Sequence, residues 1–143
     1  MDTDAPDYFR VRQWWRQWFG SRAESWVAKY LRRLGWRVVG QNERVHGVGE
    51  IDLLGLDGQT IVVVEVRSSA SQSFEELAAS IDVAKQRRLS RAALYFLRRR
   101  RLLDIAVRFD VLLLRWPETA ATPEVVHHRD AFDVQGVRFQ MFD

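Results

Sequence analysis

Hydrophobic and polar positions alternate across residues 49–67, where two apolar runs flank the dipeptide Asp57-Gly58. Such a dipeptide between strand-like runs predicts a β-hairpin, because the residues of a tight two-residue loop need positive φ and these two tolerate it. With Asp57 and Gly58 as the loop, Asp52 lies opposite Val63. The hairpin supplies two antiparallel strands of the predicted sheet.

Acidic residues occupy strand positions in this hairpin where hydrophobic residues are expected. Side chains two positions apart share a face, so one face carries Glu50, Asp52, Glu65 and Arg67. Asp52 and Glu65 become diagonal neighbours with Cα atoms roughly 7–8 Å apart or less. They can share one divalent cation, and oxygen ligands without His or Cys favour Mg²⁺ or Mn²⁺. Alternatively, Glu50 and Glu65 face solvent on an open sheet and pair with Arg44 or Arg67.

The remaining pattern predicts an α/β fold with an αβββαβ core, a mixed sheet flanked by helices. The last core strand follows a helix, so it should pair in parallel through a right-handed crossover. Residues 42–49 are expected to form a polar loop. The other predicted elements are a helix over 21–34, a strand over 36–42, one long helix over 74–100, a strand over 104–116, and weaker strands over 124–127 and 136–141.

An amphipathic, Trp-rich helix is predicted over 8–19, because apolar residues recur at helical spacing. Its Trp and Arg side chains could stack on bases or lie on a membrane surface. We favour packing on the domain or on a second subunit, since three exposed tryptophans would form a large apolar patch. The predicted organisation is an extension over 1–19 and one domain over 20–143, with a homodimer through the helix as one expectation.

Composition narrows the function classes. The 143 residues include no cysteine, which excludes a disulfide framework, a thiolate nucleophile and a Cys-based zinc site. We find no apolar run near the roughly 18 residues of a membrane span and no signal-peptide pattern, so a cytoplasmic location is expected. Of 22 basic residues, 20 are Arg. The planar guanidinium suits phosphate, so nucleic acid is a candidate partner, although codon composition explains the bias equally well.

Basic residues of the predicted helix over 74–100 separate into two groups. Arg87 and Arg91 lie opposite its apolar face, as a solvated charge run does. Arg88 falls within the apolar arc and Lys85 at its margin, which solvation explains poorly. The adjacent residues His127 and His128 would point to opposite faces of a strand, so no metal role is expected for them.

Two segments carry a resemblance to a known family. Gly49-Glu50-Ile51-Asp52-Leu53 followed by Val64-Glu65-Val66-Arg67 resembles the Asp…Glu-x-Lys core of the restriction-endonuclease-like nuclease superfamily, which includes Holliday-junction-resolvase-like members. The chain from about 20 to 132 is similar to the YraN family of small bacterial proteins. The similarity continues through Lys85-Gln86-Arg87-Arg88-Leu89, Arg108-Phe109-Asp110-Val111 and Asp130-Ala131-Phe132.

The resemblance implies a Mg²⁺-dependent or Mn²⁺-dependent endonuclease that acts on branched or free-ended DNA, with RNA as an alternative. Asp52 and Glu65 match the metal-binding acids, with the Val66 carbonyl as a further ligand. Glu24 matches a first-helix acid, although with Ser21 it also has the spacing of a helix capping box. Lys85 and Gln86 match helix residues near the site and would position the phosphate with Arg67. The expected nucleic-acid-binding residues are Arg44, Arg87, Arg88 and Arg91.

Arg67 departs from the family pattern, which has lysine at this position. Arginine stays protonated, so it can stabilise charge but cannot act as a base. Three alternatives follow: Lys85 supplies that function from the helix, activity is weak, or the domain only binds. Three hypotheses therefore stand: a metal-dependent nuclease, a non-catalytic nucleic-acid-binding module, and a dimeric interaction scaffold organised by the Trp-rich helix.

Overall fold

A computed structural model describes residues 22–45 and 49–133. Within these ranges one five-stranded sheet has the order β1-β2-β3-β4-β5, with only the β3–β4 pair parallel. The predicted α/β class, the mixed sheet and the parallel crossover strand are confirmed. The Trp-rich helix over 8–19 and the strand over 136–141 lie outside the described residues. The elements are α1 (Arg22–Arg33), β1 (Arg37–Val45), β2 (Gly49–Asp57), β3 (Thr60–Ser69), α2 (Phe74–Ala79), α3 (Val83–Arg99), β4 (Val107–Arg115) and β5 (Glu124–Phe132).

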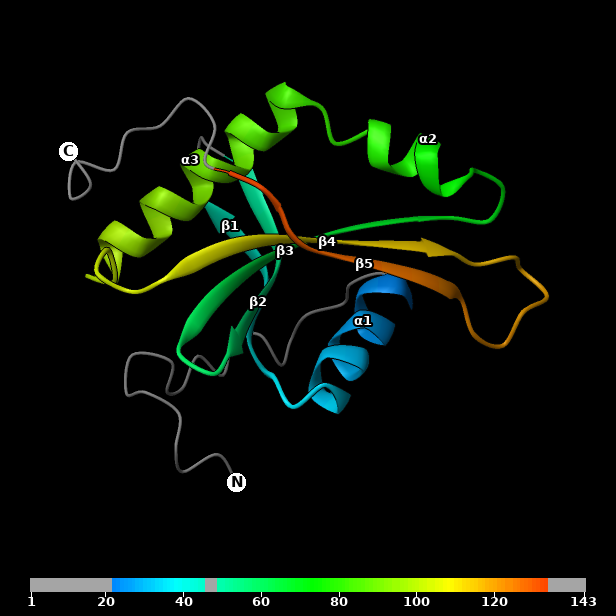
Figure 1. Ribbon diagram of the computed structural model, residues 1–143, viewed down its shortest axis with the longest axis horizontal. Helices are drawn as coiled ribbons and strands as arrows, with labels where there is room; N and C mark the ends of the chain where they lie inside the picture. The colour runs from blue at the N-terminus through cyan, green and yellow to red at the C-terminus, as the bar shows by residue number, and fades with distance from the viewer. Residues whose placement is uncertain (1–21, 46–48, 134–143) are drawn as a thin grey trace.

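Helices cover both faces of the sheet, α1 on one side and α2 and α3 on the other (Figure 1). Three hydrophobic clusters result within the described ranges, one on the α1 face and two on the face covered by α2 and α3, the smaller of which lies under α2. The α3 cluster includes Ile61, Val63, Leu89 and Phe96, and the α1 cluster includes Val27, Leu31, Val62, Val64 and Leu112. Strands that are covered on both faces need apolar residues at consecutive positions, which explains the continuous apolar runs in β3 and β4.

The predicted hairpin is present, but its predicted register is wrong by two residues. Leu53 pairs with Val64 and Asp57 with Thr60, so the loop residues are Gly58 and Gln59. Gly58 has φ of +60°, and a glycine with positive φ at the first loop position is typical of a type II′ turn. A shift of two residues keeps every side chain on its predicted face. The observed pairing ends at Leu53 and Val64, immediately before Asp52 and Glu65.

The single helix predicted over 74–100 is two helices. The helical conformation is interrupted at residues 80–82. The Asp82 side chain caps the second helix, α3, by accepting a hydrogen bond from the Lys85 backbone N–H at 2.8 Å. The new helix turns Leu89 into the core and leaves Arg88 exposed, so the predicted position of Arg88 in the apolar arc is wrong. The break brings the first turn of α3 against the end of β3.

Two boundaries also differ from prediction. β1 continues to Val45, through part of the predicted 42–49 loop, and a positive φ at Asn42 together with a register shift near Gly40 accommodates the bend. β5 runs to Phe132 instead of ending at His127. Among the described residues, no helix is both long and apolar enough to span a membrane.

Candidate metal centre

Two acidic side chains lie together where β2 and β3 separate. The Asp52 carboxylate accepts a hydrogen bond from the Val66 backbone N–H at 3.0 Å, in place of continued strand pairing. Glu65 precedes Val66 and is 1% exposed. The predicted grouping of Asp52, Glu65 and the Val66 peptide is therefore present, and the alternative in which Glu65 faces solvent is not.

Two cations face Glu65 from different elements. The Arg67 guanidinium lies 2.7 Å from Glu65 Oε1, and the Lys85 ammonium, from the first turn of α3, lies 3.6 Å from the same oxygen. Arg67 also donates from Nε to the Ser80 hydroxyl at 3.1 Å, which ties it to the break between α2 and α3. The pair of Glu65 with Arg67 is the one that the alternative interpretation expected, whereas the role of Arg67 and Lys85 at a phosphate stays a prediction. Ser80 was not among the predicted site residues.

Burial and like charge govern protonation at this centre. Burial, followed by the charge of Asp52, raises the pKa of Glu65 to about 7, although Lys85 and Arg67 act in the opposite direction. Burial also raises the pKa of Asp52, against the hydrogen bond from Val66 and the charges of Lys85 and Arg67. Two carboxylates side by side, one buried and one half-buried, resist a second ionisation, and Arg67 and Lys85 offset this only in part, so one of them tends to keep a proton.

Glu24, in the first turn of α1, approaches the pair from the other face of the sheet. Burial and then the charge of Asp52 raise its pKa to about 7, while the Asn42 amide opposes the shift and Glu50 adds to it. Ser21, its partner in the predicted capping box, lies outside the described residues. Glu50 lies opposite Arg44 in the β1–β2 pairing, at the outer end of the acidic face.

The other predicted residues are more distant from the acids. The Gln86 amide donates to the Ile81 carbonyl at 3.1 Å and lines a separate cavity of about 390 Å³ beside β5. Its role at a phosphate stays a prediction. The predicted nucleic-acid-binding residues are all exposed, one on β1 and three on α3: Arg44, Arg87, Arg88 and Arg91.

The residues fit a magnesium-type site in part. Across 22–45 and 49–133, no three His, Cys, Asp or Glu side chains converge closely enough to form a metal cluster as they stand. However, Mg²⁺ is commonly held by one or two carboxylates and keeps several waters. Glu65 Oε2 is buried and receives no hydrogen bond from a described donor. A cation between Glu65 and Asp52 would satisfy that oxygen, whereas Glu24 and the Val66 carbonyl stay predicted ligands.

A second polar network, which the sequence analysis missed, joins β4 to its neighbours. Asp110 is fully buried and accepts hydrogen bonds from Arg108 Nε at 2.9 Å and from the Asp130 backbone N–H at 2.9 Å. His127 Nε2 lies 2.8 Å from Asp110, and its Nδ1 lies 3.2 Å from the Tyr30 hydroxyl of α1. The pattern Arg108-x-Asp110 within an apolar strand was the available signal.

The fold and the two carboxylates at the end of a hairpin define an α/β protein with a restriction-endonuclease-like core. Residues 23–114 match the uncharacterised protein family UPF0102. The UPF0102 protein of Rhodopirellula baltica is 38% identical over 141 residues, which cover 90% of this chain and 84% of that protein. That of Geobacter sulfurreducens is 36% identical over 115 residues, covering 80% and 88%. That of Bordetella avium is 40% identical over 124 residues, covering 83% and 85%.

The chain belongs to UPF0102, which is the YraN family that the sequence predicted.

Proposed function

We propose that this protein is a metal-dependent nuclease that acts on DNA, with Mg²⁺ or Mn²⁺ held by Asp52 and Glu65. The observation that supports it is a pair of carboxylates of raised pKa, buried Glu65 and half-buried Asp52, beside two cations. A buried acid pair is costly in a protein interior unless a cation offsets it. Residues whose pKa values are shifted in this way are more frequent at catalytic and binding sites than elsewhere in proteins.

The chemistry divides between the bound cation and the chain. The cation supplies Lewis acidity toward a phosphate oxygen and makes a nearby water more acidic. Arg67 and Lys85, which now face Glu65, would turn to the non-bridging oxygens of the scissile phosphate. Arg67 stays protonated and stabilises developing charge only, whereas Lys85 can also exchange a proton. Glu24, with a pKa of about 7, can hold or release a proton near neutral pH.

The substrate would lie across the exposed arginines. Arg87, Arg88 and Arg91 project from α3, which begins at the acidic centre, and Arg44 lies at the far end of β1. Arginine neutralises backbone phosphates and releases counterions, so binding should weaken steeply as salt is raised. Branched or free-ended DNA is the proposed substrate, and Gln86 would contact it from the first turn of α3.

The test is incubation of the purified full chain with branched, flapped and single-stranded DNA in the presence of Mn²⁺ or Mg²⁺. We expect cleavage by the wild type and a loss of at least about 100-fold in Asp52→Asn, because removing one ligand charge weakens the metal site. Products are resolved on denaturing gels with end-labelled strands.

The matched control is Asp104→Asn, which removes the same charge from an exposed loop position. It should cleave like the wild type. Absence of cleavage in the wild type on every substrate, or equal cleavage by Asp52→Asn, would contradict the proposal.

One observation favours a second candidate, a DNA-binding module without catalysis. The Arg67 guanidinium lies 2.7 Å from Glu65 Oε1, so a fixed positive charge already offsets the acid that a metal would bind. This candidate predicts salt-sensitive DNA binding that Arg88→Gln with Arg91→Gln weakens and Asp52→Asn leaves unchanged. Calorimetric titration with Mn²⁺ separates the two functions, because only the nuclease binds the ion through Asp52.

A further inference from the structure

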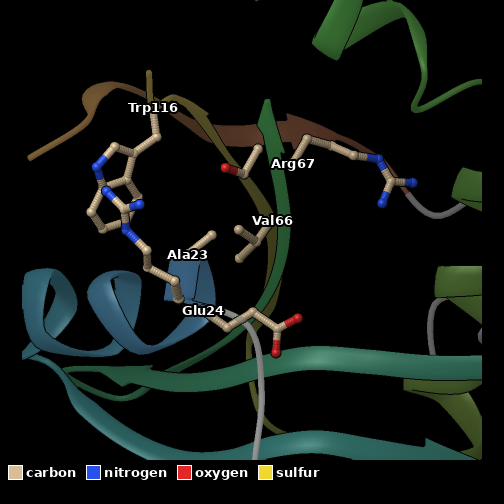
Figure 2. Close-up of a pocket in the computed structure, with 7 residues that line it drawn as sticks. Ala23, Glu24, Val66, Arg67 and Trp116 are labelled. Atoms are coloured by element: carbon tan, nitrogen blue, oxygen red, sulfur yellow. The ribbon is translucent and has the colours of Figure 1, made fainter. Parts of the chain in front are cut away.

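A cavity of about 470 Å³ opens beside the candidate metal centre, between the start of α1 and the ends of β3 and β4. Three of its lining residues, Glu24, Val66 and Arg67, belong to that centre, and Arg22, Ser68 and Trp116 complete the wall. In Figure 2, Trp116 lies on one side of Val66, and the side chains of Glu24 and Arg67 extend to the other. The cavity therefore runs from an aromatic wall to Glu24, the acidic residue that α1 contributes to the centre.

The aromatic wall is held in one orientation. The indole N–H of Trp116 donates to the Ala120 carbonyl at 2.9 Å, and its backbone N–H donates to the Ser69 carbonyl at 2.9 Å. Trp26 of α1 meets the ring edge-on, with centroids 6.4 Å apart and planes at 70°. A ring fixed before binding loses little conformational entropy when a ligand stacks beside it.

A guanidinium forms a second planar surface on this wall. The central carbon of the Arg22 guanidinium lies 3.6 Å from the centroid of the Trp116 ring, and one of its N–H groups donates to the Ala120 carbonyl at 3.0 Å. A guanidinium has five N–H donors, more than this contact uses, so others can reach a phosphate. Arginine planes and aromatic rings are both surfaces on which unpaired bases stack.

We propose that this cavity binds one unstacked nucleotide of the strand that is cut, with its base against the Arg22–Trp116 wall and its phosphate toward Arg67 and Ser68. The volume lies in the range of small-ligand sites, roughly 300–1,000 Å³. Since a nucleotide inside a duplex is stacked and paired, it must be unpaired before it can enter. The inference rests on the proposed function and narrows its substrate to DNA with a single-stranded segment at the cleavage point.

Binding without turnover tests the proposal. Fluorescence anisotropy is measured for the full chain in Ca²⁺ with three labelled DNAs: a single strand, a flap and a fully paired hairpin of equal charge. We expect Trp116→Leu to weaken binding of the single strand and the flap about tenfold, because stacking of one base is lost. Binding of the paired hairpin should stay unchanged. Trp116→Phe, which keeps an aromatic face, should stay within about threefold of the wild type.

Arg22→Gln provides a second variant that does not disturb the half-buried Trp116 ring, because Arg22 is exposed. It should lower the affinity for the single strand severalfold, and Arg33→Gln, an exposed arginine at the other end of α1, should affect single and double strands alike. Equal losses on all three DNAs, or unchanged single-strand affinity in Trp116→Leu and Arg22→Gln with wild-type melting, would overturn the inference.

These outcomes are separate from those for the nuclease. Trp116-dependent binding of the single strand without metal-dependent cleavage would support nucleotide binding in the cavity and contradict the nuclease activity. The opposite result is cleavage of paired and unpaired DNA at equal rates that Asp52→Asn abolishes and Trp116→Leu leaves unchanged. It would support the nuclease activity and contradict nucleotide binding in the cavity.

Discussion

Glu65 is a buried acid with an acid and two cations around it. Its pKa is raised to about 7, first by burial and then by the charge of Asp52. The folded protein therefore holds a proton that the unfolded chain releases near pH 4.5. Stability from this group is fully present below that pH, decreases as pH rises toward 7, and is absent above it.

We predict that Glu65→Gln raises the free energy of unfolding of the metal-free protein at pH 8 by roughly 1–2 kcal/mol, because a neutral amide avoids the cost of ionising a buried carboxyl. The decrease in stability between about pH 4.5 and 7 should become shallower, and the remainder belongs to Glu24 and Asp52. Urea unfolding at several pH values measures both effects. Glu118→Gln, at an exposed position, is the control and should retain the wild-type slope; a variant less stable at pH 8 would refute the assignment.

In the proposed function, Arg67 would contact the phosphate from a position where the family has lysine. Its guanidinium binds Glu65 at 2.7 Å and Ser80 at 3.1 Å, which holds the fork in place, whereas lysine would be one mobile ammonium that can lose a proton. We predict that Arg67→Lys raises Mn²⁺-dependent cleavage about tenfold or more with little change in melting temperature. Single-turnover kinetics on a flap substrate provide the rate.

Lys85→Ala distinguishes the role of Lys85 from that of Arg67. If Lys85 performs the proton-transfer role, its removal costs far more activity in the wild type than in the Arg67→Lys background. Equal losses in both backgrounds would show that the two positions act independently.

At the scale of elements, the apolar pattern predicted which face of a strand a side chain occupies better than it predicted where the elements begin and end. Period-two alternation placed Asp52 and Glu65 on one face of the hairpin, and this remained true although the register differed by two residues. Register depends on which two residues form the turn, and both Asp57-Gly58 and Gly58-Gln59 satisfy turn chemistry locally. Glu24 and Lys85 come from helices distant in sequence, so only family resemblance associated them with the acids.

The break between α2 and α3 was missed because apolar spacing continues across it. Asp82 was the available signal, since Asp is a preferred N-cap residue. The cavity wall could not be predicted from the sequence, because Arg22 and Trp116 meet only when α1 packs on the end of β4.

The cap at Asp82 has a measurable consequence. Its side chain accepts the Lys85 N–H at 2.8 Å, so it fixes the turn that carries Lys85 to Glu65. We predict that Asp82→Ala lowers the free energy of unfolding by roughly 0.5–2 kcal/mol, the usual cost of losing a cap, and also reduces cleavage. Asp82→Asn, which can cap the same helix, should show neither effect in urea unfolding and activity assays. A destabilised asparagine variant would mean that charge, and not capping, is responsible.

At the scale of the whole molecule, Asp110 is the centre of a polar network that connects several elements. Through its partners it links α1, β2, β4 and β5, since Arg108 also reaches Asp57 at 2.9 Å. Burial acts to raise the pKa of Asp110, but hydrogen bonds from His127, Arg108 and the Asp130 backbone outweigh it and hold this pKa below its ordinary value. The stability it contributes is therefore present above the pKa of an unfolded Asp and is lost as pH falls below it.

We predict that Asp110→Asn lowers the free energy of unfolding at pH 7 by roughly 3–5 kcal/mol, because Arg108 and His127 lose their buried partner. The loss should be smaller near pH 3, because below the pKa of an unfolded Asp the wild type begins to lose the stability that this charge contributes. Urea unfolding at the two pH values provides the comparison. Asp57→Asn, whose side chain is 32% exposed, should cost much less; equal losses at both pH values would show that the charge of Asp110 does not stabilise the fold.

The hydrogen bond from Val66 to Asp52 makes the centre observable by spectroscopy. That amide proton is held by a side chain whose charge state changes when a cation arrives, so its NMR frequency and its rate of deuterium exchange depend on the occupancy of the site. An ¹⁵N-labelled sample titrated with Mg²⁺ would report binding at one assigned resonance, with no DNA present. The same resonance in Asp52→Ala should be insensitive to the ion, so this one amide of β3 would report directly whether the proposed site binds a metal.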